Sequence, residues 1–132
     1  MTHINLANMK NIFVLSFNNL GLDFWRKHLE IVNTERIYQF TSPENCLKSM
    51  NCEPDLIIVD DYFATTKAGQ IDAKKVLQAF NIILPSTICL HISPTYCYNA
   101  TFEAETNTYR SNFNQDILTK INVLLHKGQV AA

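Results

Sequence analysis

The chain has 132 residues, of which 47% are hydrophobic and 17% are charged, and its formal net charge is -1. This length and composition suffice to bury one apolar core, so we expect a single domain over 1–132, with its core at about 11–127 and a disordered tail at 128–132. The charge balance leaves no basic excess for binding nucleic acid or an anionic membrane.

The first part of the chain alternates predicted strands and helices. The apolar run 11–17 favours a buried strand, and apolar residues spaced by three and four over 22–32 indicate an amphipathic helix. Residues 36–41 alternate as in a half-buried edge strand. Ser-Pro at 42–43 is typical of a helix start, and that helix should end near residue 51.

The strongest strand prediction is 55–60, where four branched apolar residues precede an aspartate, as in the central strand of a sheet. After a polar loop, 71–80 has helical periodicity. The segment 86–92 is a fourth strand. The segment 93–106 is compatible with either one short helix or an aromatic-rich loop.

A short strand at 108–111 and a helix that starts at Asn114 and stops at Gly128 complete the pattern. Strands alternating with helices imply right-handed crossovers and a parallel sheet covered on both faces. We therefore predict an α/β fold, a flavodoxin-like doubly wound five-stranded parallel sheet in a (βα)5 three-layer sandwich. Ligand chemistry in such sheets collects at the carboxyl ends of the strands.

The segment from Pro43 to Asp60 ends in Pro-Asp-Leu-Ile-Ile-Val-Asp. It resembles the part of response-regulator receiver domains, the CheY-like modules of two-component signalling, that leads into their phosphoacceptor aspartate. The order of predicted elements over 11–127 also agrees with that family. The resemblance implies that Asp60 occupies the phosphoacceptor position.

Most of the pocket that supports phosphoryl transfer in that family is replaced here. The acidic pair expected after the first strand, which would hold Mg²⁺, reads Ser16 and Phe17. His91 takes the place of a hydroxyl residue at the end of the fourth strand, and Ser111 replaces a lysine after the fifth. Because phosphoryl transfer depends on positioning and charge stabilisation, we interpret Asp60 as inherited geometry without that chemistry.

Asp61 offers a second carboxylate directly after Asp60. The two could bind a metal with Asn18 or Asn19, but adjacent strand residues face opposite sides and should not converge. His91 could act in acid-base or phosphoryl chemistry, although a histidine at a buried strand end is more often a hydrogen-bonded structural group.

Other kinds of site find little support. No thiol is placed beside a histidine as a cysteine hydrolase requires, and three glycines in the whole chain do not favour a phosphate cradle for a nucleotide or flavin. The polar N-terminus resembles no signal peptide, and no apolar run could span a membrane, so we expect a cytoplasmic protein. Four cysteines without metal-site spacing should be free thiols: Cys46, Cys52, Cys89 and Cys97.

Aromatic residues around the fifth strand are candidates for a partner surface, because Tyr and Phe supply large contact area at interface cores. They could equally pack onto the fourth and fifth strands. The residues are Tyr96, Tyr98, Phe102 and Tyr109.

We therefore expect a non-enzymatic, receiver-like signalling module that needs no cofactor and acts independently of phosphorylation. Its partner would be a protein, either a histidine kinase, a downstream signalling protein or a second copy in a homodimer. One alternative is a weakly Mg²⁺-dependent receiver phosphorylated on Asp60. Another is a small-molecule sensor that uses the strand-end crevice around His91 and Ser111.

Overall fold

A computed structural model describes residues 10–16, 23–27, 35–61, 73–93, 101–112 and 116–126. Its strands are β1 (Lys10–Ser16), β2 (Glu35–Phe40), β3 (Leu56–Asp60), β4 (Ile88–Ile92), β5 (Thr101–Glu103) and β6 (Thr108–Ser111). Its helices are α2 (Pro43–Lys48), α3 (Ala73–Ile83) and α4 (Ile117–His126), with short 3-10 helices η3 (Met50–Cys52) and η5 (Ala104–Thr106). Residues 23–27 are also helical.

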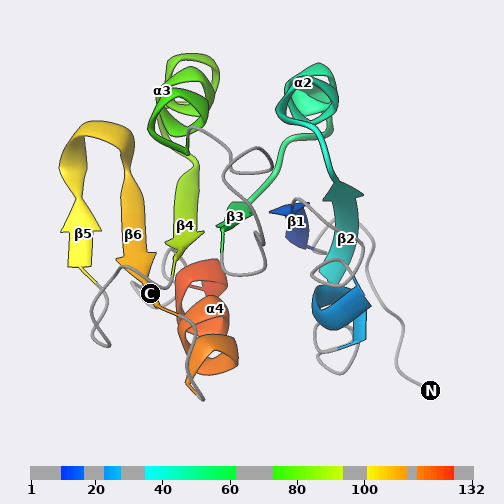
Figure 1. Ribbon diagram of the computed structural model, residues 1–132, viewed down its shortest axis with the longest axis vertical. Coiled ribbons are helices and arrows are strands. Elements are labelled where there is room, and N and C mark those ends of the chain that lie inside the picture. Colours follow the sequence, from blue (N-terminus) through cyan, green and yellow to red (C-terminus); the bar gives the residue numbers. More distant parts are fainter. Residues whose placement is uncertain are drawn as a thin grey trace.

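The strands form one six-stranded sheet in the order β2-β1-β3-β4-β6-β5 (Figure 1). From β2 to β6 every neighbouring pair is parallel, and β3 lies near the middle. The parallel part confirms the predicted doubly wound α/β fold and its central strand.

The prediction of one short helix or an aromatic-rich loop over 93–106 was wrong for residues 101–106. Residues 101–103 form β5, an antiparallel partner of β6, and 104–106 form η5. Asn107, which has a left-handed φ of 52°, turns the chain back into β6. A tight turn of this kind favours a hairpin over a helix, so the sheet gains a sixth, antiparallel strand.

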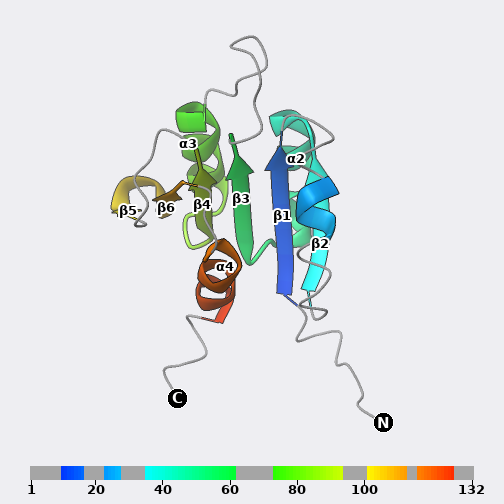
Figure 2. The ribbon, with the colours of Figure 1, turned by 60° about the horizontal axis from the view of Figure 1, so that its bottom comes forward.

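Helices cover both faces of the sheet. In Figures 1 and 2, α2 and α3 lie on one face, and α4 and the short helix at 23–27 lie on the other. The alternation of strand side chains divides the core accordingly. Ile58 packs in the cluster under α4, while Val59 packs in the cluster under α2 and α3.

The start of β3 is pinned to β1 by Asn11. Its backbone N–H donates to Oδ2 of Asp55 over 2.7 Å, and its side-chain amide donates to the carbonyl oxygen of Cys52 over 2.8 Å. Glu53, with a left-handed φ of 54°, turns the chain between η3 and β3. These contacts set the register that later brings Asp60 beside Ser16.

Several sequence predictions are refined at element ends. The helix expected to run from 42 to about 51 divides into α2 and η3, and Ser42 makes no side-chain capping hydrogen bond. The helix expected at 22–32 is described only at 23–27. The residues proposed to start and stop the last helix, 114 and 128, lie outside the described residues, as does the tail. No helix in the described ranges is long and apolar enough to span a membrane.

Candidate functional site

The carboxyl ends of the parallel strands meet at one edge of the sheet, and the register fixes the neighbours there. Ser16 of β1 is in register with Asp60 of β3. Asp60 is in register with Ile92 of β4, and Ile92 with Ser111 of β6. Because neighbouring strands lie about 4.8 Å apart, these residues form one row across the sheet.

Asp60 is fully buried on the α4 face of the sheet, two residues beyond Ile58, which packs in the core of that face. The indole N–H of Trp25 donates a hydrogen bond to Asp60, with Nε1 and Oδ2 2.5 Å apart. A buried carboxylate needs such donors, because taking it out of water without them costs several kcal/mol. The central residue of the candidate site is therefore held by the protein itself.

Trp25 is fixed over the strand ends by its neighbours. It is fully buried in the α4-face cluster, and the Phe24 ring packs edge-on against it, with ring centroids 5.2 Å apart and an interplanar angle of 89°. The next residue, Arg26, donates from two nitrogens to Oε1 of Gln39 over 3.3 and 3.2 Å. The helical turn at 23–27 is thereby tied to β2 while its tryptophan reaches Asp60.

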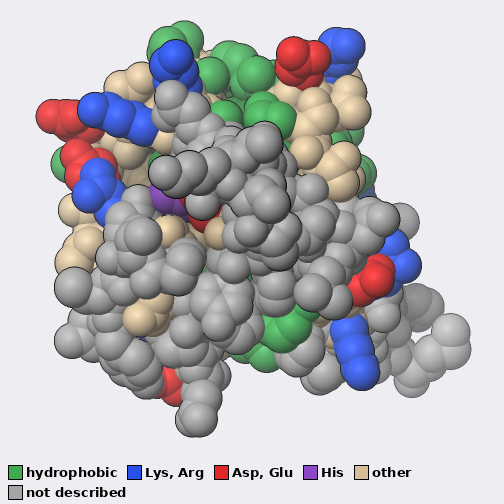
Figure 3. Space-filling view, viewed as in Figure 1, with side chains coloured by type: hydrophobic (Ala, Val, Ile, Leu, Met, Phe, Trp, Pro, Cys, Tyr) green, Lys and Arg blue, Asp and Glu red, His purple; other side chains and the backbone are tan. Residues whose placement is uncertain are grey.

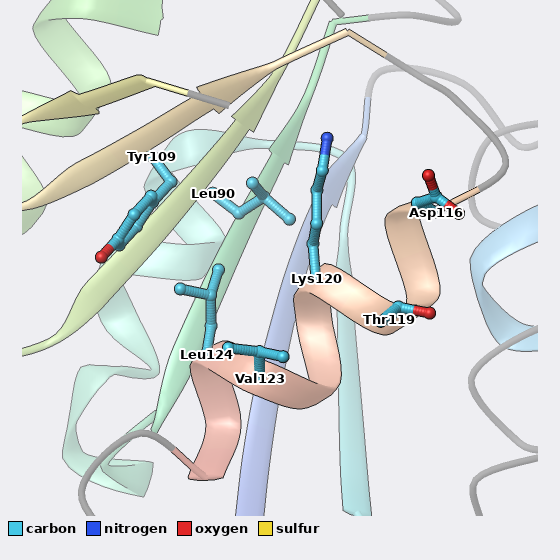
Figure 4. A pocket seen from close by; sticks show the side chains of 7 residues that line it. All are labelled: Leu90, Tyr109, Asp116, Thr119, Lys120, Val123 and Leu124. Atoms are coloured by element: carbon cyan, nitrogen blue, oxygen red, sulfur yellow. The ribbon is translucent and has the colours of Figure 1, made fainter. Parts of the chain in front are cut away.

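Lys120 brings a positive charge to the strand edge from α4. Its Nζ donates to Oγ of Ser111 over 3.1 Å, and that hydroxyl donates to the carbonyl oxygen of Asn112 over 2.9 Å. Figure 4 shows the Lys120 side chain extended from α4 along the sheet. An ammonium thus reaches the strand end at which the resemblance implied a lysine, but from the following helix.

Ser16 occupies the position next to Asp60 and is fully buried. Its hydroxyl has no hydrogen-bond partner among the described residues. Ser16 and Ser111 are therefore two buried serines in the same row of the sheet, with one hydroxyl unsatisfied and the other bonded on both sides.

Asp61 and His91 form a separate pair on the α3 face. His91 Nε2 and Asp61 Oδ2 are 2.7 Å apart, and the two side chains are 7% and 16% exposed. Cys89, two residues before His91, packs in the core cluster of this face. Asp60 and Asp61 thus turn to opposite faces and do not form the paired carboxylate site considered from the sequence.

A polar pocket of about 250 Å³ opens beside His91, between α3 and the β5–β6 hairpin. Its lining includes His91 but not Ser111, the two residues around which the sequence placed the crevice of a small-molecule sensor. Figure 3 shows basic and acidic side chains over this part of the surface, to one side of a partly covered histidine. Its lining residues are Lys74, Leu77, Gln78, His91, Glu103, Glu105, Thr106 and Arg110, of which Arg110 and Glu103 form an ion pair.

His91, assigned from the sequence to the hydroxyl position at the end of β4, turns its side chain toward Asp61 on the α3 face. Ile92, and not His91, is in register with Asp60, and the first residue beyond β4 is Ser93. Ser93 is buried, and its backbone N–H donates to the carbonyl oxygen of Ser111 over 3.1 Å. Ser93 is therefore a buried hydroxyl residue directly beyond β4, two positions after His91.

The described cysteines are free thiols, as predicted, and two of them are buried: Cys46 and Cys89. Burial, with a smaller contribution from nearby Cys89, raises the pKa of the Cys46 thiol to about 12. Burial also raises the pKa of Cys89 to about 12, against a smaller opposing effect of a hydrogen bond with Thr108. Neither thiol is a thiolate near neutral pH, which argues against nucleophilic chemistry at these positions.

An apolar pocket of about 270 Å³ lies on the other face, between α4 and the strands β4 and β6. Figure 4 shows Leu90 and Leu124 pointing toward each other across it, with the Tyr109 ring on the far wall. The ring of Phe102 on β5 packs against Tyr109 at an interplanar angle of 48°, with ring centroids 4.7 Å apart, and Phe102 is 50% exposed. Val123 beside the pocket is 58% exposed.

Some candidate residues lie outside the described residues: Phe17, Tyr96, Tyr98, Cys97 and the asparagines at 18–19. Sequence reasoning missed the roles of Trp25 and Lys120 at the strand edge. The apolar periodicity of the first helix marked Trp25 only as a core residue. Within the described ranges, no three His, Cys, Asp or Glu side chains are grouped so that they could hold a metal ion.

Comparison with known proteins supports the fold assignment. No protein-family model matches the sequence, and no curated protein matches it. A CheY-like response regulator receiver domain from Methanospirillum hungatei superposes with a TM-score of 0.69 at 16% identity, over 95% of this chain and 100% of that one. The signal receiver domain of an HD domain-containing protein from Pseudomonas fluorescens gives 0.68 at 14% identity, over 93% and 99%.

A third solved structure is the signal receiver domain of a modulated diguanylate cyclase from Desulfovibrio desulfuricans, described as an example of alternate folding. It gives a TM-score of 0.63 at 14% identity and covers 95% of this chain and 100% of that one. The chain therefore has the flavodoxin-like fold of response-regulator receiver domains, with a sixth strand added at one edge.

The hydrogen bond between Trp25 and Asp60 predicts energetic coupling between the two side chains. In a double-mutant cycle of Trp25→Phe and Asp60→Leu, we expect a coupling free energy of about 1.5–3 kcal/mol, the range for hydrogen bonds to charged groups. Urea denaturation of the four proteins measures it. Additive effects of the two substitutions would contradict the interaction.

The two buried serines of the row provide a matched pair of variants. Ser111→Ala should lower the free energy of unfolding by about 1 kcal/mol, because Lys120 and Asn112 lose a partner. Ser16→Ala should be neutral or stabilising, because it removes a buried hydroxyl without a described partner. Chemical denaturation measures both, and the reverse ranking would refute the assigned contacts.

Proposed function

We propose that this protein is a receiver-like signalling module that acts by binding another protein and does not depend on phosphorylation of Asp60. The observation that carries the proposal is the burial of Asp60 beneath Trp25, with an indole N–H on Oδ2. A phosphoacceptor must present its carboxylate oxygen to an incoming phosphoryl group in line with the leaving oxygen.

The immediate surroundings of Asp60 also support a non-catalytic role. Its in-register neighbour on β1 is Ser16, a neutral side chain in place of a metal-binding carboxylate. The second carboxylate, Asp61, is turned to the opposite face and paired with His91. Mg²⁺ prefers several oxygen ligands and is bound with the help of one or two carboxylates, so the described residues supply a poor cation site.

The binding surface that we propose consists of β5, β6 and α4. It carries the stacked rings of Phe102 and Tyr109, the exposed Val123 and the apolar pocket beside α4. Exposed apolar groups gathered on one face mark interaction sites, and aromatic residues often supply their binding energy. A histidine kinase or a downstream signalling protein would be a partner of this kind.

One observation favours a second candidate function, a weakly Mg²⁺-dependent receiver phosphorylated on Asp60. Lys120 brings an ammonium to Ser111 at the strand edge, and Ser93 adds a hydroxyl residue beyond β4. Both kinds of group can stabilise the charge of a phosphoryl group. This candidate requires Trp25 to release Asp60 when the phosphoryl group binds.

Titration with Mg²⁺ and beryllofluoride, a phosphoryl mimic, separates the two candidates. Trp25 is the sole tryptophan of the chain and contacts Asp60 directly, so its fluorescence reports any change at that carboxylate. We expect no saturable change in fluorescence, with circular dichroism confirming that the protein is folded.

The matched control is Asp60→Asn, which keeps the shape of the side chain and an acceptor oxygen for the indole. A saturable response of the natural protein that disappears in Asp60→Asn would favour the phosphorylated switch and overturn the proposal. A response that survives in Asp60→Asn would arise away from Asp60 and leave the proposal standing.

A further inference from the structure

The polar pocket on the α3 face has two walls and a floor. Helix α3 supplies one wall, where Lys74, Leu77 and Gln78 lie on one side of the helix at spacings of three and four residues. The β5–β6 hairpin with η5 supplies the other wall, and His91 of β4 forms the floor. Lys74 and Gln78 are exposed, whereas Leu77 and His91 are buried. The pocket therefore leads from a polar mouth down to the sheet.

Hydrogen bonds hold the two walls in place. The side-chain amide of Asn81 on α3 donates to the carbonyl oxygen of Glu105 over 3.1 Å and so ties η5 to the helix. At the base of the hairpin, the side-chain amide of Asn107 donates to the carbonyl oxygen of Thr87 over 3.2 Å. The histidine of the floor is held in turn by Asp61, at 2.7 Å. A pocket whose walls are fixed in this way loses little freedom when it binds a ligand.

The described lining residues include two cationic and two anionic side chains. Arg110 and Glu103 already form an ion pair within the hairpin. The other two line the pocket from opposite walls, Lys74 from α3 and Glu105 from η5. A purely anionic ligand would lie close to carboxylates, and a purely cationic one close to cations, and like charges brought together disfavour binding. A ligand with one charge of each sign meets an opposite charge on each wall.

We propose that this pocket binds a small zwitterion of the amino-acid class. Lys74 pairs with its carboxylate and Glu105 with its ammonium group. Gln78 and Thr106 add hydrogen bonds, because an amide and a hydroxyl both donate and accept, and Leu77 contacts the hydrocarbon part. The volume of about 250 Å³ lies below the roughly 300–1,000 Å³ of pockets for drug-sized molecules, which limits the ligand to a small one.

The inference goes beyond the proposed function and does not rest on it. The pocket lies on the α3 face of the hairpin, whereas the proposed partner surface includes the rings of Phe102 and Tyr109 on the α4 face. Alternation of strand side chains places Glu103 and Arg110 on the face opposite to these rings. Binding of the zwitterion can therefore be measured without the protein partner.

Isothermal titration calorimetry of the full chain with the free proteinogenic amino acids tests the site. We expect saturable binding of at least one of them, with one ligand per chain. For an amino acid that binds, the N-acetyl derivative lacks the ammonium group and the amide derivative lacks the carboxylate. Each derivative should bind at least roughly tenfold more weakly, the loss expected when a hydrogen bond between charged groups is removed.

Two variants and their matched controls assign these charges to the pocket. Lys74→Met and Glu105→Gln should each weaken binding roughly tenfold, because each removes one charge from a wall. Lys75→Met and Glu44→Gln remove the same charges outside the described lining and should bind as the natural chain does. All four side chains are exposed, so the variants should fold, which circular dichroism checks.

Four results would each overturn the proposal. They are no saturable binding of any amino acid by the folded protein, undiminished binding of the acetylated or amidated derivative, unchanged affinity of Lys74→Met or Glu105→Gln, and an equal loss of affinity in the control variants. None of these results bears on Asp60, whose role is decided separately by the fluorescence titration.

Discussion

A buried carboxylate at the end of the central strand constrains the rest of this molecule. Asp60 is fully buried in the row of residues at the carboxyl ends of the parallel strands. A charge in such a place must be hydrogen-bonded, or it destabilises the fold. Trp25 provides an indole donor, and for this its helical turn must stay fixed against β2, where Arg26 bonds Gln39. The contact that satisfies Asp60 thus also occupies one oxygen of its carboxylate.

Two other charged side chains near the strand ends, Asp61 and Lys120, each have a described partner other than Asp60. Alternation of strand side chains sends Asp61 to the α3 face, where it meets His91 beside a polar pocket. Lys120 is engaged with Ser111, two strands away from Asp60 in the row. The hairpin that takes the chain from β5 to β6 adds the aromatic pair of Phe102 and Tyr109 at the other end of the row.

Much of the fold could be predicted from the sequence, because short apolar runs and helical periodicity are local signals. The run before Asp60 identified the central strand, and the resemblance placed Asp60 correctly at its end. The hairpin at 101–106 was missed because its decisive feature, the left-handed turn at Asn107, needs no hydrophobic period. Trp25 was missed as a site residue because its partner Asp60 is distant in sequence. Lys120 was missed because its contact with Ser111 joins α4 to β6, and only tertiary packing brings the two side chains together.

The central claim is that Asp60 does not accept a phosphoryl group. Incubation of the folded protein with acetyl phosphate and Mg²⁺, followed by mass spectrometry of the intact chain, tests it most directly, with Asp60→Asn as the control. The account predicts no added phosphoryl mass in either protein. A phosphoryl adduct on the natural chain that is absent from Asp60→Asn would contradict it.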